Sequence, residues 1–146
     1  MADLIKEVSD LAAGTGWNVE SLPRNAVEKA GFEKGIELTS PSSDLRIEIM
    51  HSSEEVFCNF GGYGRTGSST AADDNREMPT KLIGILQDVF RYGVDVKVFR
   101  RGAKILRSVV STGPPEKRRV IAKTYNSIGF VREKKEGLRL GVPTRS

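Results

Sequence analysis

His51 and Cys58 are the only histidine and the only cysteine of the chain, so thiol or imidazole chemistry depends on these two residues. They could form a nucleophile–base pair if neighbouring strands brought them within hydrogen-bond reach. Position 51 lies at the end of a predicted strand, whereas Cys58 alternates with apolar neighbours in the next one. We therefore expect a buried structural thiol and a surface imidazole. Two such groups without further ligands or a C-x-x-C spacing predict no metal site, and no cofactor is expected.

Three glycines with G-x-G-x-x-G spacing follow a predicted strand: Gly62, Gly64 and Gly67. In dinucleotide-binding folds the last of these glycines begins a helix, and the helix N-terminus faces the pyrophosphate. Here Gly67 leads into small polar residues without apolar periodicity, so the required βαβ context is missing. We interpret residues 61–76 as a polar loop in which Tyr63 and Arg65 are candidate contact residues.

Positive charge is concentrated near the C-terminus. Residues 97–146 contain 14 Lys and Arg against 3 Asp and Glu, whereas residues 1–96 contain 9 against 16. The candidate partner-binding cations in this basic region are Arg100, Arg101, Lys104, Arg107, Lys117, Arg118 and Arg119. Such a set suits phosphates or an acidic protein surface. The alternative interpretation is that the acidic and basic parts of the chain complement each other within the fold.

Length and composition limit the possible classes of protein. A chain of 146 residues suits one domain, and 29% charged with 38% hydrophobic residues lies outside the disordered class. No apolar run is long enough for a transmembrane helix, and the first residues lack the pattern of a signal peptide. One cysteine excludes an internal disulfide, so a cytoplasmic location is predicted.

The densest apolar pattern, at 77–110, predicts an amphipathic helix followed by a β-hairpin. Pro79 suits a first helical turn, and apolar residues then recur at spacings of three and four through 82–90. Gly93 predicts the end of the helix. Alternating valines from Val94 and a second apolar run from Ile105 predict the two hairpin strands.

Two short helices are predicted before this segment, at 2–13 and 23–30, with Trp17 as a core anchor and Ser21 as an N-cap. Alternation then predicts a three-strand antiparallel meander over 36–39, 45–50 and 56–60.

Beyond the hairpin, Pro115 predicts the start of a last helix, with apolar residues on one face through Ile128. Residues 130–131 are predicted as a last short strand, and 132–146 as a basic C-terminal tail. The expected fold is a single α+β domain over 1–131. Its antiparallel sheet would have about five strands, a meander plus a hairpin, packed by three to four helices.

The order of features in 35–110 resembles the small immunity proteins that neutralise bacterial polymorphic toxins. The resemblance rests on the segment Ile36 to Pro41, the strand Leu45 to Met50, the segment Glu55 to Tyr63, the helix Lys81 to Phe90, and the strand Val94 to Phe99 with Arg101 to Lys104. It implies a protein that binds a toxin domain and blocks its active site without catalysis.

A second resemblance, over 80–131, is to the C-terminal half of a GNAT acyltransferase. It rests on the helix at 81–92, the strand at 94–99 and the segment Ala122 to Phe130. It implies an acyl-CoA site, with Tyr125 as general acid. The pyrophosphate-binding position, 74–79, contains no glycine, so the resemblance is to a degenerate member.

The sequence therefore favours a non-enzymatic protein-binding module whose partner has an acidic surface. A nucleic-acid-binding protein is the first alternative, and a degenerate acyltransferase is the second. Aromatic residues are sparse around the cations, so a platform for stacking single-stranded bases is not predicted.

Overall fold

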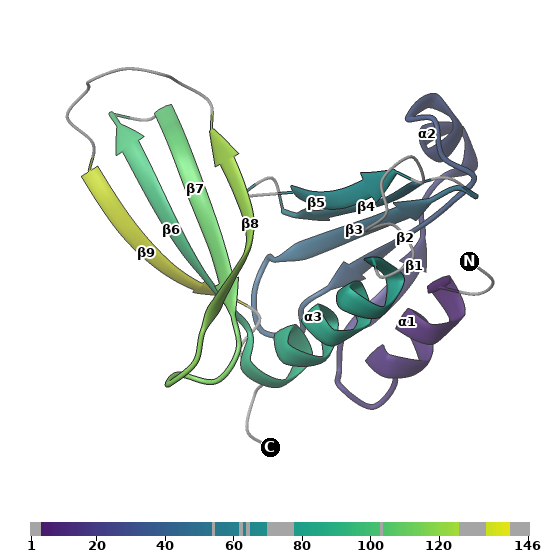
Figure 1. Ribbon diagram of the computed structural model, residues 1–146, viewed down its shortest axis with the longest axis horizontal. Coiled ribbons are helices and arrows are strands. Elements are labelled where there is room, and N and C mark those ends of the chain that lie inside the picture. The colour runs from purple at the N-terminus through teal and green to yellow at the C-terminus, as the bar shows by residue number, and fades with distance from the viewer. Residues whose placement is uncertain are drawn as a thin grey trace.

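The computed structural model describes residues 4–53, 55–61, 63, 65–69, 78–102, 104–125 and 134–140 (Figure 1). It confirms an α+β fold. The elements in chain order are α1 (Leu4–Ala12), β1 (Asn18–Ser21), α2 (Arg24–Lys29), β2 (Lys34–Thr39), β3 (Arg46–His51), β4 (Glu55–Phe60), β5 (Arg65–Ser69), α3 (Met78–Tyr92), β6 (Val94–Arg101), β7 (Lys104–Thr112), β8 (Arg119–Tyr125) and β9 (Lys134–Leu140). No helix in the described ranges is both long enough and apolar enough to cross a membrane.

All strand pairs are antiparallel, in the order β1-β2-β3-β4-β5-β8-β7-β6-β9. Among the described residues, β5 and β8 are linked by one register pair, Arg65 and Lys123. The sheet therefore consists of a first half-sheet, β1–β5, and a second half-sheet, β6–β9, set at an angle to each other (Figure 1). The prediction of one five-strand sheet was wrong, because four further strands take part.

The first half-sheet buries one face against α1 and α3. Alternation along β2, β3 and β4 places the inward residues in shared rows, such as Leu38, Ile47 and Phe60. The helices contribute apolar residues at helical spacing to the same core: Leu4, Val8, Ala12, Leu82, Leu86 and Val89. The Trp17 ring lies 5.3 Å from the Phe90 ring, between centroids, so the predicted core anchor is confirmed.

The hairpin predicted after α3 is confirmed as β6 and β7. Val94, Val96 and Val98 are buried, and their register partners on β7 include Val110. Gly93 has a φ of 74°, which a glycine adopts without strain, and it makes the sharp turn from α3 into β6. The Gly93 carbonyl accepts a 2.7 Å hydrogen bond from the buried Thr112 hydroxyl, which ties the hairpin to the helix end.

The helix predicted from Pro115 is instead strand β8. Pro115 lies in the turn after β7, and β8 pairs with β7 over Arg119–Tyr125. Val120, which the helical interpretation placed on a buried stripe, is 52% exposed. The segment is rich in β-branched residues, and the free edge of the hairpin offered it a backbone partner. The predicted end of that helix and the short strand at 130–131 lie outside the described residues.

Three further expectations need correction. The stretch 61–76, predicted as a loop, contains β5, which pairs with β4 through Arg65–Ser69. The stretch 132–146, predicted as a tail, contains β9, which pairs with β6 along Lys134–Leu140. Ser21 lies in β1, and the N-cap of α2 is Pro23, which makes no side-chain capping bond. Residues 70–77 and 141–146 lie outside the described residues.

Candidate functional site: a basic sheet face

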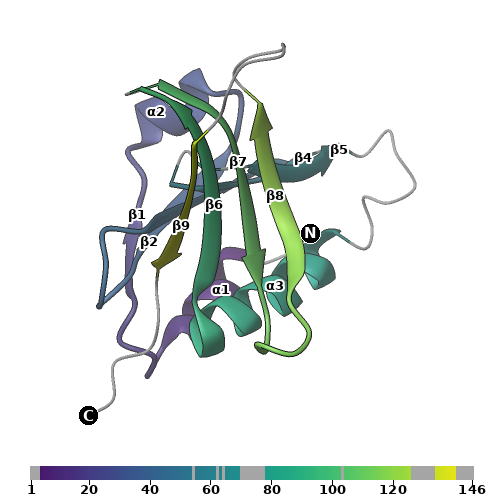
Figure 2. The ribbon, with the colours of Figure 1, turned by 90° about the vertical axis from the view of Figure 1, so that its left-hand side faces the viewer.

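The second half-sheet has one face on the core and one face turned away from it. Because Val94, Val96 and Val98 are buried, the alternate residues of β6 point to the opposite side. We call this side of β6–β8 the basic sheet face. Its centre carries Lys97, Phe99, Arg107, Val109 and Lys123, and its end toward the β7–β8 turn carries Asp95, Ser111 and Val120. In Figure 2 it faces the viewer, and α1 and α3 lie behind the strands.

At the centre of this face, the strand register places side chains of neighbouring strands in two rows. Lys97, Val109 and Lys123 form one row, and Phe99 and Arg107 belong to the next. Both lysines are exposed, and neither forms an ion pair with another residue that the structure describes. Two strand spacings separate them, about 10 Å, which is near the screening length at physiological salt. Their potentials therefore add above the half-buried Val109.

Arg107 lies over the ring of Phe99, with the guanidinium carbon 3.9 Å from the ring centroid. Both side chains are half-buried. A cation–π contact of this kind contributes about 0.5–2 kcal/mol and limits the rotamers of the arginine. Arg107 is thus held on the face in a fixed orientation, and its guanidinium covers one side of the ring.

The row that contains Lys97 and Lys123 continues into the first half-sheet, because β8 pairs with β5. Lys123 is the register partner of Arg65, which is itself opposite Asn59 of β4. The predicted contact residue Arg65 therefore lies at the junction of the two half-sheets, next to a cation that belongs to the face.

Tyr63 lies at the same junction, in the turn between β4 and β5. Its N–H donates to the Phe60 carbonyl at 3.0 Å, and its own carbonyl accepts a hydrogen bond from the Ser108 hydroxyl of β7. The side chain is partly buried and packs against the core. These contacts give Tyr63 a structural role, and its role in partner binding stays a prediction.

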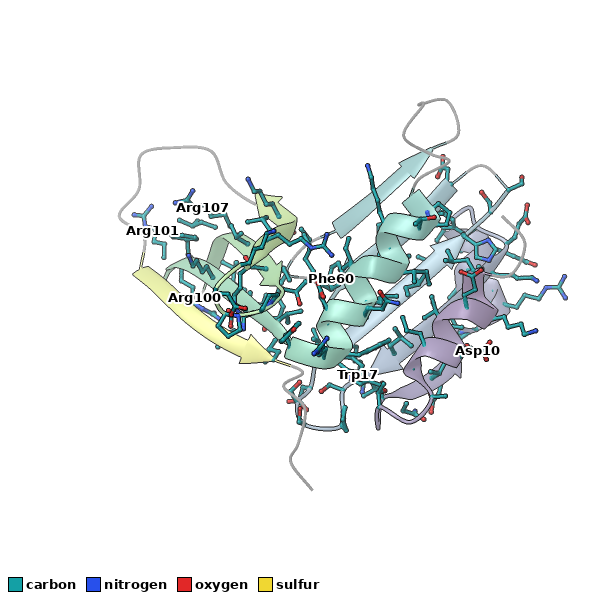
Figure 3. All side chains as sticks on the ribbon, turned by 60° about the horizontal axis from the view of Figure 1, so that its bottom comes forward. Asp10, Trp17, Phe60, Arg100, Arg101 and Arg107 are labelled. Atoms are coloured by element: carbon teal, nitrogen blue, oxygen red, sulfur yellow. The ribbon has the colours of Figure 1, made fainter. Side chains whose placement is uncertain are left out.

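The predicted cations at the hairpin tip lie together at one end of β6 and β7. Arg101 is exposed, Arg100 is half-buried, and Lys104 is the register partner of Arg101 across the turn at Gly102. Figure 3 shows Arg100, Arg101 and Arg107 on the second half-sheet, across the molecule from Asp10 of α1.

The other predicted cations lie at the opposite end of the strands. β7 has nine residues, so the β7–β8 turn is roughly 30 Å from the hairpin tip. There Arg118 pairs with Asp95 at 2.8 Å, and Arg119 pairs with Asp88 of α3 at 3.2 Å. Lys117 is exposed in the turn. The acidic and basic parts of the chain therefore do complement each other here, and the predicted set does not form one cluster.

Cys58 and His51 are both buried on the inner face of the first half-sheet. Burial raises the pKa of the Cys58 thiol far above its usual range, which leaves it protonated and a poor nucleophile. The expectation of a buried thiol is confirmed, but that of a surface imidazole was wrong, since His51 is only 7% exposed. Within the described ranges no three His, Cys, Asp or Glu residues come together as a metal site.

The glycine motif does not precede a helix. Gly67 lies inside β5, antiparallel to β4, so this part of the chain lacks a dinucleotide-binding βαβ unit. Gly62 and Gly64 lie outside the described residues.

Sequence reasoning missed the centre of the basic sheet face. Alternation along β6 already places Lys97 on the face away from the buried valines, so the sequence pattern could have identified this residue. Lys123 and Val109 enter the same row only once 119–125 is recognised as a strand.

Comparisons with known proteins do not assign the chain to a family. No protein-family model, curated protein or solved structure matches it.

Proposed function

We propose that this protein is a non-enzymatic binding module that contacts an acidic surface of a partner protein through the basic sheet face. The observation that carries the proposal is the row Lys97–Val109–Lys123 beside the stacked Arg107. It offers two exposed ammonium groups, an oriented guanidinium and an apolar centre on a side that the described helices do not cover.

A protein partner fits the face better than a nucleic acid does. Protein interfaces have an apolar or aromatic centre with arginine anchors and a polar rim. Val109 and the Phe99–Arg107 pair supply such a centre, and Lys97 and Lys123 supply the rim. Because Arg107 covers one side of the Phe99 ring, that side is closed to a stacking base.

An inhibitory role of the immunity-protein kind agrees with this chemistry. Cations that bind carboxylates can mask an acidic active site without any reaction of their own. The deeply buried Cys58 is no candidate for catalysis. The acidic partner would be the reverse of the common pairing, in which an acidic inhibitor covers a basic nuclease.

Nucleic-acid binding is the second candidate, and one observation favours it. Arg65, Lys123 and Lys97 occupy positions in one continuous row, which suits a phosphate backbone. Such binding would weaken steeply with salt whatever the base sequence.

The experiment compares two double variants of equal charge. Lys97→Glu/Lys123→Glu reverses the face, whereas Lys6→Glu/Lys29→Glu reverses two exposed lysines of α1 and α2. Circular dichroism first establishes that both are folded. Each protein is then titrated with poly-L-glutamate and with a random DNA duplex, at about 50 mM and about 200 mM salt.

We expect the wild type and the helix variant to bind poly-L-glutamate equally, and the face variant to bind at least about tenfold more weakly, because two attractions become repulsions. Equal loss in both variants would refute a specific face. Tight duplex binding that disappears at the higher salt, together with weak polyglutamate binding, would establish the nucleic-acid alternative.

A further inference from the structure

Strand β9 forms one end of the sheet order. It pairs with β6 without interruption from Val94 opposite Leu140 to Arg100 opposite Lys134. A regular strand at a sheet end presents a row of backbone N–H and C=O groups along its outer edge, and no other described strand pairs with that edge. Such an edge can accept an extended segment by β-augmentation.

The centre of this edge has space beside a cation. Gly137 is exposed, and a Cβ added there would have nothing within 4 Å in the described part of the chain. Its register partner is Lys97, the exposed lysine of the basic sheet face. An acidic side chain placed opposite Gly137 on an added strand could therefore reach toward the Lys97 ammonium without obstruction.

The other side of β9 is apolar only toward its C-terminal end, beyond Glu136, the register partner of Val98. Leu138 and Leu140 are opposite the buried Val96 and Val94, and they pack against the core while remaining partly exposed. Side chains of an added strand on that side would extend the core row. An apolar residue there would remove further leucine surface from water.

We propose that β9 accepts an extended segment of the partner as a tenth strand, with acidic residues toward the basic sheet face and apolar residues toward the core side. This inference rests on the proposed function and deepens it. The acidic partner contributes a strand of alternating pattern, so recognition combines backbone pairing with the charge of Lys97.

A second copy of this chain, paired with the same edge around Gly137, is disfavoured. An antiparallel β9–β9 pair centred on Gly137 would place Lys135 opposite Arg139 of the other copy, twice by symmetry. Like charges directly opposite each other destabilise a strand pair. An acidic heterologous strand has no such repulsion.

The test uses the full chain and a fluorescent peptide, Val-Glu-Val-Glu-Val-Glu-Val, with two N-methylated twins. One twin carries N-methyl groups on its Glu residues and the other on its Val residues. Successive amides of a strand point to opposite edges, so only one twin loses the N–H groups that face β9. We expect that twin to bind about tenfold to a hundredfold more weakly and the other twin to bind like the parent peptide.

Two further measurements use the same peptide. Lys97→Glu should weaken binding by about tenfold, because an attraction becomes a repulsion, and the matched Lys6→Glu should not. Hydrogen exchange should show new protection at alternate amides of β9 when the peptide is bound.

The outcomes separate this inference from the proposed function. Equal binding of both twins would mean face contact without strand addition, which overturns the inference and leaves the proposed function standing. Failure of the parent peptide to bind at low salt also overturns it, as does sedimentation of the free chain as a dimer with protected β9 amides. Loss of the difference between the two charge-reversal double variants would instead refute the proposed function.

Discussion

The Ser108 hydroxyl donates a hydrogen bond to the backbone carbonyl of Tyr63, which joins β7 to the turn between β4 and β5. Ser108 is only 2% exposed. This bond and the register pair of Arg65 with Lys123 connect the two half-sheets on the β5–β8 side. The orientation of the basic sheet face relative to the first half-sheet therefore depends on a few polar contacts as well as on the shared core.

Ser108→Ala should lower the free energy of unfolding by about 1–3 kcal/mol, because a buried hydrogen bond is lost and the Tyr63 carbonyl is left without this donor. Urea unfolding followed by fluorescence of Trp17 measures the change. Ser53→Ala, at an exposed position, is the control and should be nearly neutral. An equal effect of the two substitutions would mean that the Ser108 bond contributes little.

The thiol of Cys58 predicts a dependence of stability on alkaline pH. Burial raises its pKa in the folded state, whereas the thiol of the unfolded chain ionises near its ordinary value of 9.0. Above that pH the unfolded state releases a proton that the folded state keeps, so the free energy of unfolding falls by up to about 1.4 kcal/mol per pH unit.

Urea unfolding of the wild type and Cys58→Ala at intervals between about pH 8 and 9.5 tests this slope. The alanine variant lacks the ionising group, so the difference in stability between the two proteins should shrink as pH rises. A difference that stays constant over this range would show that the thiol pKa is not raised. Other groups titrating at high pH cancel in the comparison.

The two ion pairs at the β7–β8 turn should differ in strength. The Arg118 side chain is 18% exposed, whereas that of Arg119 is 53% exposed. Arg118→Met should cost about 1–3 kcal/mol, because the guanidinium of this pair is poorly hydrated and Asp95 loses its charged partner. Arg119→Met should cost less than about 1 kcal/mol, as exposed pairs usually do.

Double-mutant cycles with Asp95→Asn and Asp88→Asn would isolate each coupling energy. We expect the Arg118–Asp95 coupling to exceed the Arg119–Asp88 coupling, and to persist at about 1 M salt, where exposed pairs are screened. A larger or more salt-resistant Arg119 coupling would contradict the ranking by burial.

The sequence predicts an element well where one period is unambiguous. Val94, Val96 and Val98 alternate strictly, and the apolar residues of α3 recur at helical spacing, so both were identified. In β8 the side chains of Val120, Ile121 and Thr124 also fit a helical stripe, and Pro115 is typical of a helix start. Pairing with β7 decides between helix and strand for this segment, and the spacing of residues in the sequence does not encode that tertiary contact.

Strands β5 and β9 could not be found from side chains. β5 consists of small and polar residues, and β9 is mostly charged around Gly137. Both are held by backbone pairing to neighbours that are themselves well patterned. The centre of the basic sheet face could not be predicted for a related reason. Lys97 and Lys123 share a row only when β8 is a strand, so the sequence groups the cations by proximity along the chain alone.

Phe99 offers a test of the basic sheet face in which no charge changes. Phe99→Leu removes the ring under Arg107 but keeps an apolar side chain and every cation. The freed guanidinium gains rotamers, so binding of poly-L-glutamate should weaken by about three- to tenfold, equivalent to about 0.5–1.5 kcal/mol. Phe57→Leu makes the same chemical change in the first half-sheet, where Phe57 packs on Phe32, and should leave the affinity unchanged. Isothermal titration at low salt measures both variants. If the two substitutions had the same effect, or none, the stacked arginine would have no special part in binding, and the lysines alone would account for the attraction.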